Sequence, residues 1–235
     1  MQDFGEAFRL AFWLVLRADA DLVEIIGLSL QVSLTAVAIS CAIGLPLGAA
    51  IAIARFPGRN AVLVLLNALM GLPPVVVGLL VYLMLSNAGP LGWLQFLYTP
   101  AAMIVAQAIL VTPIVAALSR EFIQQLHGEY AEQFRSLCVR PATMVAALLW
   151  DARYSLLTVA LAGFGRAVAE VGAVIIVGGN INHLTRVMTT AIALETSKGD
   201  LALALALGFV LMAIALAVNA GVMALRLTAA RYAYA

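Results

Sequence analysis

Long apolar runs alternate with short polar links along most of the chain. Five runs reach the roughly 20 residues that a helix needs to cross a bilayer. They are residues 28–54, 61–85, 100–118, 155–178 and 201–225. Because they are continuously apolar and of helical length, they predict transmembrane helices rather than the alternating strands of a membrane β-barrel.

Two features modify this simple pattern. Pro73 and Pro74 lie inside the second run, and proline removes a backbone donor and clashes with the preceding helical turn. We therefore expect this helix to break near residues 71–74, with a second half beginning at Val75. The apolar stretch of residues 8–16 is too short to span, and we expect a helix lying on the membrane surface there.

The composition agrees with an integral membrane protein. Of 235 residues, 64% are hydrophobic and 11% are charged, which is more apolar surface than a soluble domain can bury. The net charge of +1 argues against a nucleic-acid partner. Residues 28–226 are interpreted as one membrane domain, preceded by an outer or interfacial segment, residues 1–27, and followed by a tail, residues 227–235.

Lysine and arginine near the ends of the runs predict the orientation, because basic residues favour the cytoplasmic side. One side carries Arg55, Arg59, Arg120, Arg135, Arg140, Arg153, Arg226 and Arg231. The other side carries Arg9, Arg17, Arg186 and Lys198. This bias predicts an outer N-terminus, a cytoplasmic C-terminus and a cytoplasmic segment of residues 119–154.

That cytoplasmic segment is the longest polar stretch between two runs. Residues 129–150 predict two short helices, and Arg140 before Pro141 suits the start of the second. The apolar positions predicted to share a face are Phe134, Leu137 and Cys138 in the first helix and Met144, Val145 and Leu148 in the second. Such a surface fits a groove on a soluble partner, and a membrane-surface loop is an equal alternative.

Residues 132–138 resemble the EAA loop of binding-protein-dependent ABC importer permeases, Glu-Ala-Ala-x3-Gly-x9-Ile-x-Leu-Pro. Glu132 stands at the glutamate position, Cys138 at the glycine position and Leu148 at the isoleucine position. Gln133 and Phe134 replace the two alanines, and residues 150–151 replace Leu-Pro. The cysteine removes the usual flexible turn residue, so the geometry of this turn is an open question.

Other segments resemble the oxyanion branch of the same family. Residues 71–80 and 86–92 are similar to molybdate and sulfate permeases, as are residues 165–172 with Gly179 and Asn180. Residues 150–154 and 185–200 are similar to tungstate-type permeases in particular. The resemblance covers roughly residues 25–225.

The resemblance implies an all-α ABC type I importer permease (MetI-like) with five transmembrane helices in a prokaryotic inner membrane. It implies a homodimer on two copies of a cytoplasmic ATPase, fed by an extracytoplasmic oxyanion-binding protein, with tungstate ahead of molybdate as the cargo. ATP and magnesium would be held by the ATPase, and this chain would have no cofactor, metal or catalytic residue. The residues implied to couple to the ATPase are Glu132, Arg135, Ser136, Leu137, Cys138, Arg140, Met144 and Leu148.

An oxyanion crossing the membrane needs hydrogen-bond donors, which a helix N-terminus supplies. We therefore hypothesise that Gly71, Pro73, Pro74 and Val75 form part of a gate, with a simple packing kink as the alternative. Arg166 and Glu170 are four residues apart in the fourth run and are predicted to share a helix face. They are candidates for the translocation path or for an ion pair within the bundle.

Past the fourth run, a polar stretch is predicted to receive the binding protein and line the outer vestibule. It comprises Asn180, Asn182, His183, Thr185, Arg186, Thr189 and Thr190, with His183 expected at the surface.

Two other functional classes fit less well. The chain has no phosphate-binding loop and no serine–histidine or paired-aspartate constellation within a run, which disfavours an enzyme. A stand-alone secondary transporter or channel for small anions would need coupling carboxylates within the spans, where only Glu170 qualifies.

Overall fold

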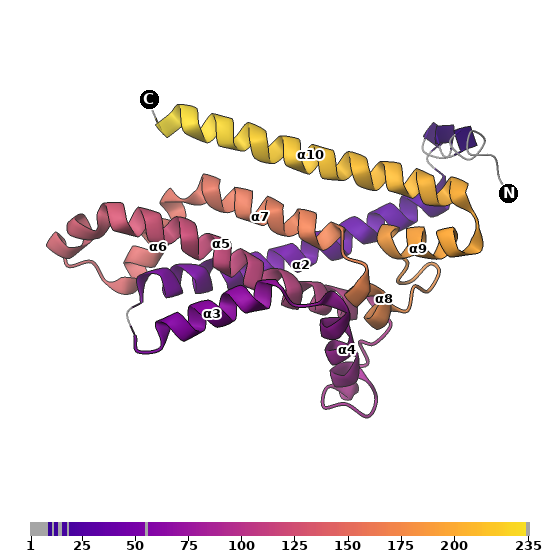
Figure 1. Ribbon diagram of the computed structural model, residues 1–235, viewed down its shortest axis with the longest axis horizontal. Coiled ribbons are helices and arrows are strands. Elements are labelled where there is room, and N and C mark those ends of the chain that lie inside the picture. The colour runs from indigo at the N-terminus through magenta and orange to yellow at the C-terminus, as the bar shows by residue number, and fades with distance from the viewer. Residues whose placement is uncertain (1–8, 11, 14–15, 18, 55, 234–235) are drawn as a thin grey trace. The chain divides into compact units, whose positions relative to one another are not determined.

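The structure is a computed structural model that describes residues 9–10, 12–13, 16–17, 19–54 and 56–233. Its regular elements are all helices, so the all-α prediction is confirmed for the described residues (Figure 1). In chain order they are α2 (Ala20–Ile53), α3 (Arg59–Met70), α4 (Pro74–Leu85), the 3-10 turn η1 (Gly92–Leu94), α5 (Pro100–Ser136), α6 (Pro141–Asp151), α7 (Arg153–Val168), α8 (Gly172–Gly178), α9 (Met188–Lys198) and α10 (Leu201–Ala233).

Three helices are long and apolar enough to cross a membrane: α2, α5 and the Leu201–Gly221 part of α10. They coincide with the first, third and fifth predicted runs. Two further pairs, α3 with α4 and α6 with α7, are apolar enough only when each broken pair is taken together. The described chain therefore has three spans, or up to five if each pair makes one. The count of exactly five stays a prediction.

The second run breaks where its prolines predict. The helix α3 ends at Met70, and the Gly71 amide closes its last turn by donating to the Ala68 carbonyl at 3.1 Å. Pro73 is the extended residue before α4, and Pro74 occupies the first helical position. Proline suits this position because the first helical residues have no intrahelical acceptor for their N–H groups.

The fourth run contains a break that the sequence analysis missed. The helix α7 ends at Val168 and α8 begins at Gly172, so Arg166 lies in the last turn of α7 while Glu170 lies between the helices. The prediction that these two residues share one helix face is therefore wrong. Glu170 folds back instead, because its carboxylate Oε1 accepts the Ala173 amide at 3.2 Å at the start of α8.

The ends of the chain are described only in part. Of the predicted surface helix at residues 8–16, Arg9, Leu10, Phe12, Trp13 and Leu16 are helical and exposed. Phe8, Ala11, Leu14 and Val15 lie outside the described residues. At the other end, α10 runs on to Ala233, without a helix end at the predicted boundary between residues 226 and 227.

The helices form two compact units. The first contains the described residues of Met1–Thr35, Pro73–Gln107 and Ala167–Asn219, and the second contains those of Ala36–Leu72, Ala108–Arg166 and Ala220–Ala235. Within the first unit, α4 packs against α8 (Figure 1). The approach is close at Gly78, where an added Cβ would lie 2.7 Å from the Ala173 Cα.

The second unit is built around close contacts between α2 and α5. An added Cβ at Gly48 would overlap the Ser119 hydroxyl and the Ala116 carbonyl. Small residues at such positions let membrane helices approach until their backbones touch, which replaces the hydrophobic driving force that lipid does not supply.

The contact at Gly78 predicts a specific sensitivity. Gly78→Ala should lower the melting temperature of the detergent-solubilised chain, because overpacking against a neighbouring backbone costs about 1–3 kcal/mol. Gly208→Ala is the matched control, since an added Cβ there has no atom within 4 Å and alanine favours a helix. Equal melting temperatures for the two variants would contradict the close packing of α4 on α8.

Candidate functional site

The predicted coupling segment is the corner between α5 and α6, residues 129–151, called here the α5–α6 corner. Its first half is the end of α5, which continues to Ser136 rather than stopping near residue 118. The separate short helix predicted from residue 129 is therefore wrong. The second predicted helix is confirmed as α6, with Arg140 extended before it and Pro141 at its first position.

The turn of this corner is a Schellman motif. The Cys138 amide donates to the Arg135 carbonyl at 3.2 Å, and the Val139 amide donates to the Phe134 carbonyl at 3.1 Å. These bonds satisfy two carbonyls at the end of α5, and they require a left-handed residue at the position of Cys138. Cys138 adopts a φ of 47°, so the cysteine makes the turn that glycine normally makes.

Burial separates the predicted coupling residues into two groups. Leu148 is fully buried among Ala49, Ala52, Ile123 and Leu156, and Met144 packs against the same cluster. These two residues fix α6 to the rest of its unit. The exposed members are Glu132, Arg135, Ser136, Leu137, Cys138 and Arg140. The predicted shared face of Phe134, Leu137 and Cys138 is wrong, because Phe134 packs inward and α5 ends before the other two.

Polar and aromatic contacts hold the corner in one shape. The Tyr130 hydroxyl donates to Asp151 Oδ2 at 2.9 Å and so joins α5 to the end of α6. The Tyr130 and Phe134 rings meet edge to face at 6.0 Å. Beside them lies an open groove of about 330 Å3, with Trp150 on its rim. Leu137 and Trp150 are each 73% exposed, so the corner carries two large apolar side chains on its surface.

The predicted gate lies at the break between α3 and α4. Pro73, Pro74 and Val75 belong to the first unit, where Val75 meets the start of α8. An added Cβ at Gly172 would lie 2.9 Å from Val75 Cγ2. The N-terminus of α4 therefore packs beside the start of α8 and the preceding Glu170. The helix that follows the first break thus contacts the helix that follows the second break.

A buried polar cluster surrounds Glu170, and the sequence analysis did not identify it. Ser29, Ser33, Gln107 and Thr189 line a cavity of about 10 Å3 with Glu170. The Thr189 hydroxyl donates to the Glu170 carbonyl at 2.8 Å, and Gln107 Nε2 donates to the Ala167 carbonyl at 3.1 Å. The only available sequence signal was the isolated polar residues within apolar runs. Polar groups in such runs are costly to bury and often mark function.

The polar stretch after α8 folds against the start of α2. His183 is exposed, as predicted, and its Nδ1 lies 2.8 Å from Glu24 Oε2. This hydrogen bond raises the pKa of His183 above its usual value, and the charge of Glu24 adds to the effect. Asp21 lies close to this pair. One carboxylate oxygen of Asp21, one of Glu24 and a ring nitrogen of His183 all lie within 4.8 Å of one another. The contact between His183 and Glu24 therefore connects the segment after α8 to the start of α2.

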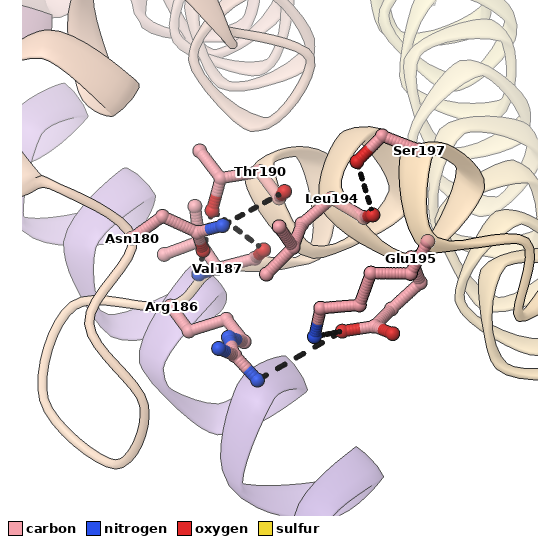
Figure 2. Close-up of polar contacts among 8 residues, drawn as sticks. Asn180, Arg186, Val187, Thr190, Leu194, Glu195 and Ser197 are labelled. Carbon is pink, nitrogen blue, oxygen red and sulfur yellow. Dashed lines mark hydrogen bonds and ion pairs between the residues drawn. The ribbon is translucent and has the colours of Figure 1, made fainter.

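Arg186 and α9 form the second part of this polar region (Figure 2). The buried carboxylate of Glu195 receives Lys198 Nζ at 2.9 Å, while Arg186 Nη1 lies 4.0 Å away. Thr190 caps α9 by bonding to Val187, and Asn180 Nδ2 donates to the Thr190 carbonyl at 3.3 Å. Most polar side chains of this stretch are thus bonded to other residues of the chain. Asn182 and His183 are exposed.

Comparison with known proteins identifies the family of this helical arrangement. The chain matches the family of binding-protein-dependent transport system inner membrane components over residues 44–227. It is 40% identical to the tungstate uptake system permease protein TupB of Peptoclostridium acidaminophilum over 96% of this chain and 99% of that protein. It is 36% identical to TupB of Campylobacter jejuni over 91% of this chain and 90% of that protein.

A third relative carries a name that refers to anions in general. The chain is 41% identical to a probable anion ABC transporter permease protein of Haloferax volcanii over 85% of this chain and 88% of that protein. The match to the family model covers most of the helices described above, including both broken pairs and the α5–α6 corner. The chain is therefore a member of the family of binding-protein-dependent transport system inner membrane components.

Proposed function

We propose that this chain is the membrane subunit of an ATP-driven importer for a tetrahedral oxyanion, with tungstate as the first candidate and molybdate as the second. The observation that carries the proposal is the 40% identity, along nearly the full length of both chains, to a tungstate uptake permease. An extracytoplasmic binding protein supplies the anion, and a separate ATPase with bound ATP and magnesium supplies the energy. The chain itself has a translocating rather than a catalytic role.

The α5–α6 corner is the proposed contact with the ATPase. A helix of 37 residues is about 55 Å long, whereas the hydrocarbon core of a bilayer is roughly 30 Å thick. The end of α5 therefore extends into water as a continuation of a membrane helix. Exposed Leu137 at its tip supplies an apolar anchor, and Glu132, Arg135 and Arg140 supply charges around it.

The proposed assembly contains two copies of this chain on two ATPase subunits in the inner membrane. The N-terminus lies outside and the C-terminus inside, as the arginine distribution favours. The polar stretch with His183 and Arg186 then faces the binding protein. The break at residues 71–75, with Arg166 and Glu170 at the second break, lines the translocation path and gates it.

Uptake into proteoliposomes tests the proposed function. The permease reconstituted with its ATPase and binding protein should accumulate labelled tungstate only when ATP is supplied on the ATPase side. The permease without the ATPase should transport none. Tungstate or chloride flux through the isolated permease would instead support a stand-alone transporter or channel and would overturn the proposal.

Charge reversal at the corner tests the coupling role. Glu132→Lys should reduce tungstate uptake per ATP hydrolysed by roughly tenfold or more, the equivalent of about 1.4 kcal/mol of coupling. Glu129→Lys, the same change one turn earlier on the exposed side of α5, is the matched control and should leave coupling close to normal. Identical uptake-to-hydrolysis ratios in the two variants would rule out Glu132 as a coupling contact.

Removal of the prolines tests the gate. Pro73→Ala/Pro74→Ala permits a continuous helix, because each interior proline disfavours helix by about 3 kcal/mol. Uptake should fall while basal ATP hydrolysis remains. Pro113→Ala is the control, since Pro113 lies within the unbroken α5. If the double variant transports and couples like the control, the break is a packing feature and has no gating role.

A further inference from the structure

Two aromatic rings and an arginine meet where α6 ends and α7 begins, at residues that the proposed coupling and gating roles do not use. The guanidinium carbon of Arg153 lies 5.2 Å from the centre of the Trp150 ring and 4.7 Å from the centre of the Tyr154 ring. Both distances are within the roughly 6 Å at which a ring attracts a cation. Arg153 Nη1 also donates to the Trp150 carbonyl at 2.9 Å. These three residues are called here the aromatic–arginine cluster.

The aromatic–arginine cluster lies on the surface of its unit. Trp150 is 73% exposed, Tyr154 is 43% exposed, and Arg153 is exposed between them. Arg153 makes no other hydrogen bond among the described residues, so most of its N–H groups can reach an acceptor outside the chain. The nearby Asp151 accepts the Tyr130 hydroxyl, and its charge balances that of Arg153. This surface therefore combines apolar rings with donors and carries no excess charge.

The exposed side chains of α7 change character directly after the cluster. Leu157 follows Tyr154 by three residues on the same helix face and is 44% exposed. Leu161 follows one turn later and is half-buried. In a membrane-spanning helix, tryptophan and tyrosine are enriched at the membrane–water interface and aliphatic residues follow within the hydrocarbon. The order of side chains on α7 therefore places the edge of the hydrocarbon layer between Tyr154 and Leu157.

The bend between α6 and α7 supports the same boundary. The two helices form an angle of 75° and together are apolar enough for one broken span. With α7 crossing the membrane, α6 lies closer to the plane of its surface, so Trp150 stays at the depth where α7 enters. The equally exposed Leu137 precedes the opposite end of α6, whose 11 residues extend about 16 Å. Leu137 and Trp150 can therefore contact different partners.

We propose that the aromatic–arginine cluster docks on the phospholipid headgroup layer of the bilayer. Its rings lie between the headgroups and the acyl chains, because each ring has an apolar body and a polar N–H or O–H group. The planar guanidinium of Arg153 binds lipid phosphate oxygens. Since Asp151 balances the charge of Arg153, the phosphate of a zwitterionic lipid serves as well as that of an anionic lipid.

This contact goes beyond the proposed function and does not depend on the cargo. In the proposed orientation, the cluster docks on the cytoplasmic leaflet. It holds the end of α6 at a fixed depth, while Leu137 at the other end of the α5–α6 corner remains available to the ATPase.

Tryptophan fluorescence of the full chain in lipid vesicles tests the docking. Trp13→Phe and Trp93→Phe leave Trp150 as the only tryptophan. The phosphatidylcholine of the vesicles carries bromine, which quenches tryptophan, either near the headgroup end of the acyl chain or near its methyl end. Two control chains add Trp150→Phe and place the tryptophan elsewhere. Leu157→Trp lies on the same face of α7 as Tyr154, and Leu137→Trp replaces a side chain as exposed as that of Trp150.

Bromine near the headgroups should quench Trp150 roughly twofold more strongly than bromine near the methyl ends, because an interfacial tryptophan sits at headgroup level. This ratio should be lower at position 157, which lies about 4.5 Å further along the helix than Tyr154. Position 137 should be quenched by acrylamide in the water and by neither lipid. Replacing half of the headgroups with phosphatidylglycerol should leave the ratio for Trp150 unchanged.

Removal of the guanidinium tests its part in the docking. Arg153→Gln should reduce the quenching of Trp150 by headgroup-proximal bromine, because the ring loses its cation and the cluster loses its phosphate contact. Arg140→Gln removes an exposed arginine at the other end of α6 and should leave the quenching unchanged. Equal quenching in the two variants overturns the role of Arg153. The parent chain and position 137 decide the docking itself, even where Arg153→Gln does not fold.

Three outcomes overturn the docking. Trp150 that is quenched by acrylamide but by neither lipid lies in water. Trp150 that is shielded from both acrylamide and lipid is covered by a second copy of the chain. Lipid quenching that disappears when the ATPase is added assigns Trp150 to the ATPase. Quenching by headgroup-proximal bromine that persists in the complete transporter supports the docking, even where tungstate is not imported and the proposed function fails alone.

Discussion

The bilayer provides no hydrogen-bond partners, and this constraint governs where the chain can interrupt a helix. A backbone N–H or C=O group without a hydrogen-bond partner in lipid costs several kcal/mol of free energy. A break in a membrane-spanning helix must therefore supply partners for its own donors and acceptors. At the first break, the Gly71 amide bonds within its own turn and the prolines carry no N–H. At the second, Glu170 and Thr189 supply side-chain partners. At both breaks, local hydrogen bonds or prolines thus reduce the number of unpaired backbone groups.

The same constraint explains why α5 is one continuous helix from Pro100 to Ser136. A continuous helix satisfies its backbone internally, so it can leave the membrane without a change of structure. Its last carbonyls are then satisfied by the Schellman turn at Cys138. Leu148 fixes α6 against the buried Ile123 of α5, and Tyr130 adds a hydrogen bond to Asp151. The α5–α6 corner is thus covalently continuous with a helix that is long and apolar enough to cross a membrane.

Local chemistry predicted part of this fold well. The apolar runs give α2, α5 and α10, and prolines give the starts of α4 and α6, because proline acts through its own covalent geometry. The break at Glu170 was missed, since glutamate is a good helix former and its capping bond depends on how the chain folds back. The resemblance placed Cys138 at a glycine position, but the left-handed backbone of Cys138 could not be predicted, because cysteine has no preference for that conformation.

Most of the candidate site depended on tertiary structure. The sequence indicated which polar residues are unusual, but it did not reveal that Leu148 is buried while Leu137 is exposed. Nor did it show that Asn67 of α3 and Arg120 of α5 line one cavity, because that cavity forms only where these two helices pack together. The resemblance to importer permeases suggested the proposed coupling role of the α5–α6 corner. The structure added its shape and its exposed residues.

The most direct test of the account is to ask what the tip of this corner touches in the assembled transporter. In a Cys41→Ser chain, the exposed native Cys138 can carry a benzophenone maleimide, and illumination then links it to its nearest neighbour. We predict a covalent adduct between this chain and the ATPase subunit, identified by mass spectrometry. The same label at Trp93→Cys, with Cys138→Gly, should give no ATPase adduct. Labelled Cys138 that links only to lipid, or equal ATPase adducts from both positions, would contradict the central claim.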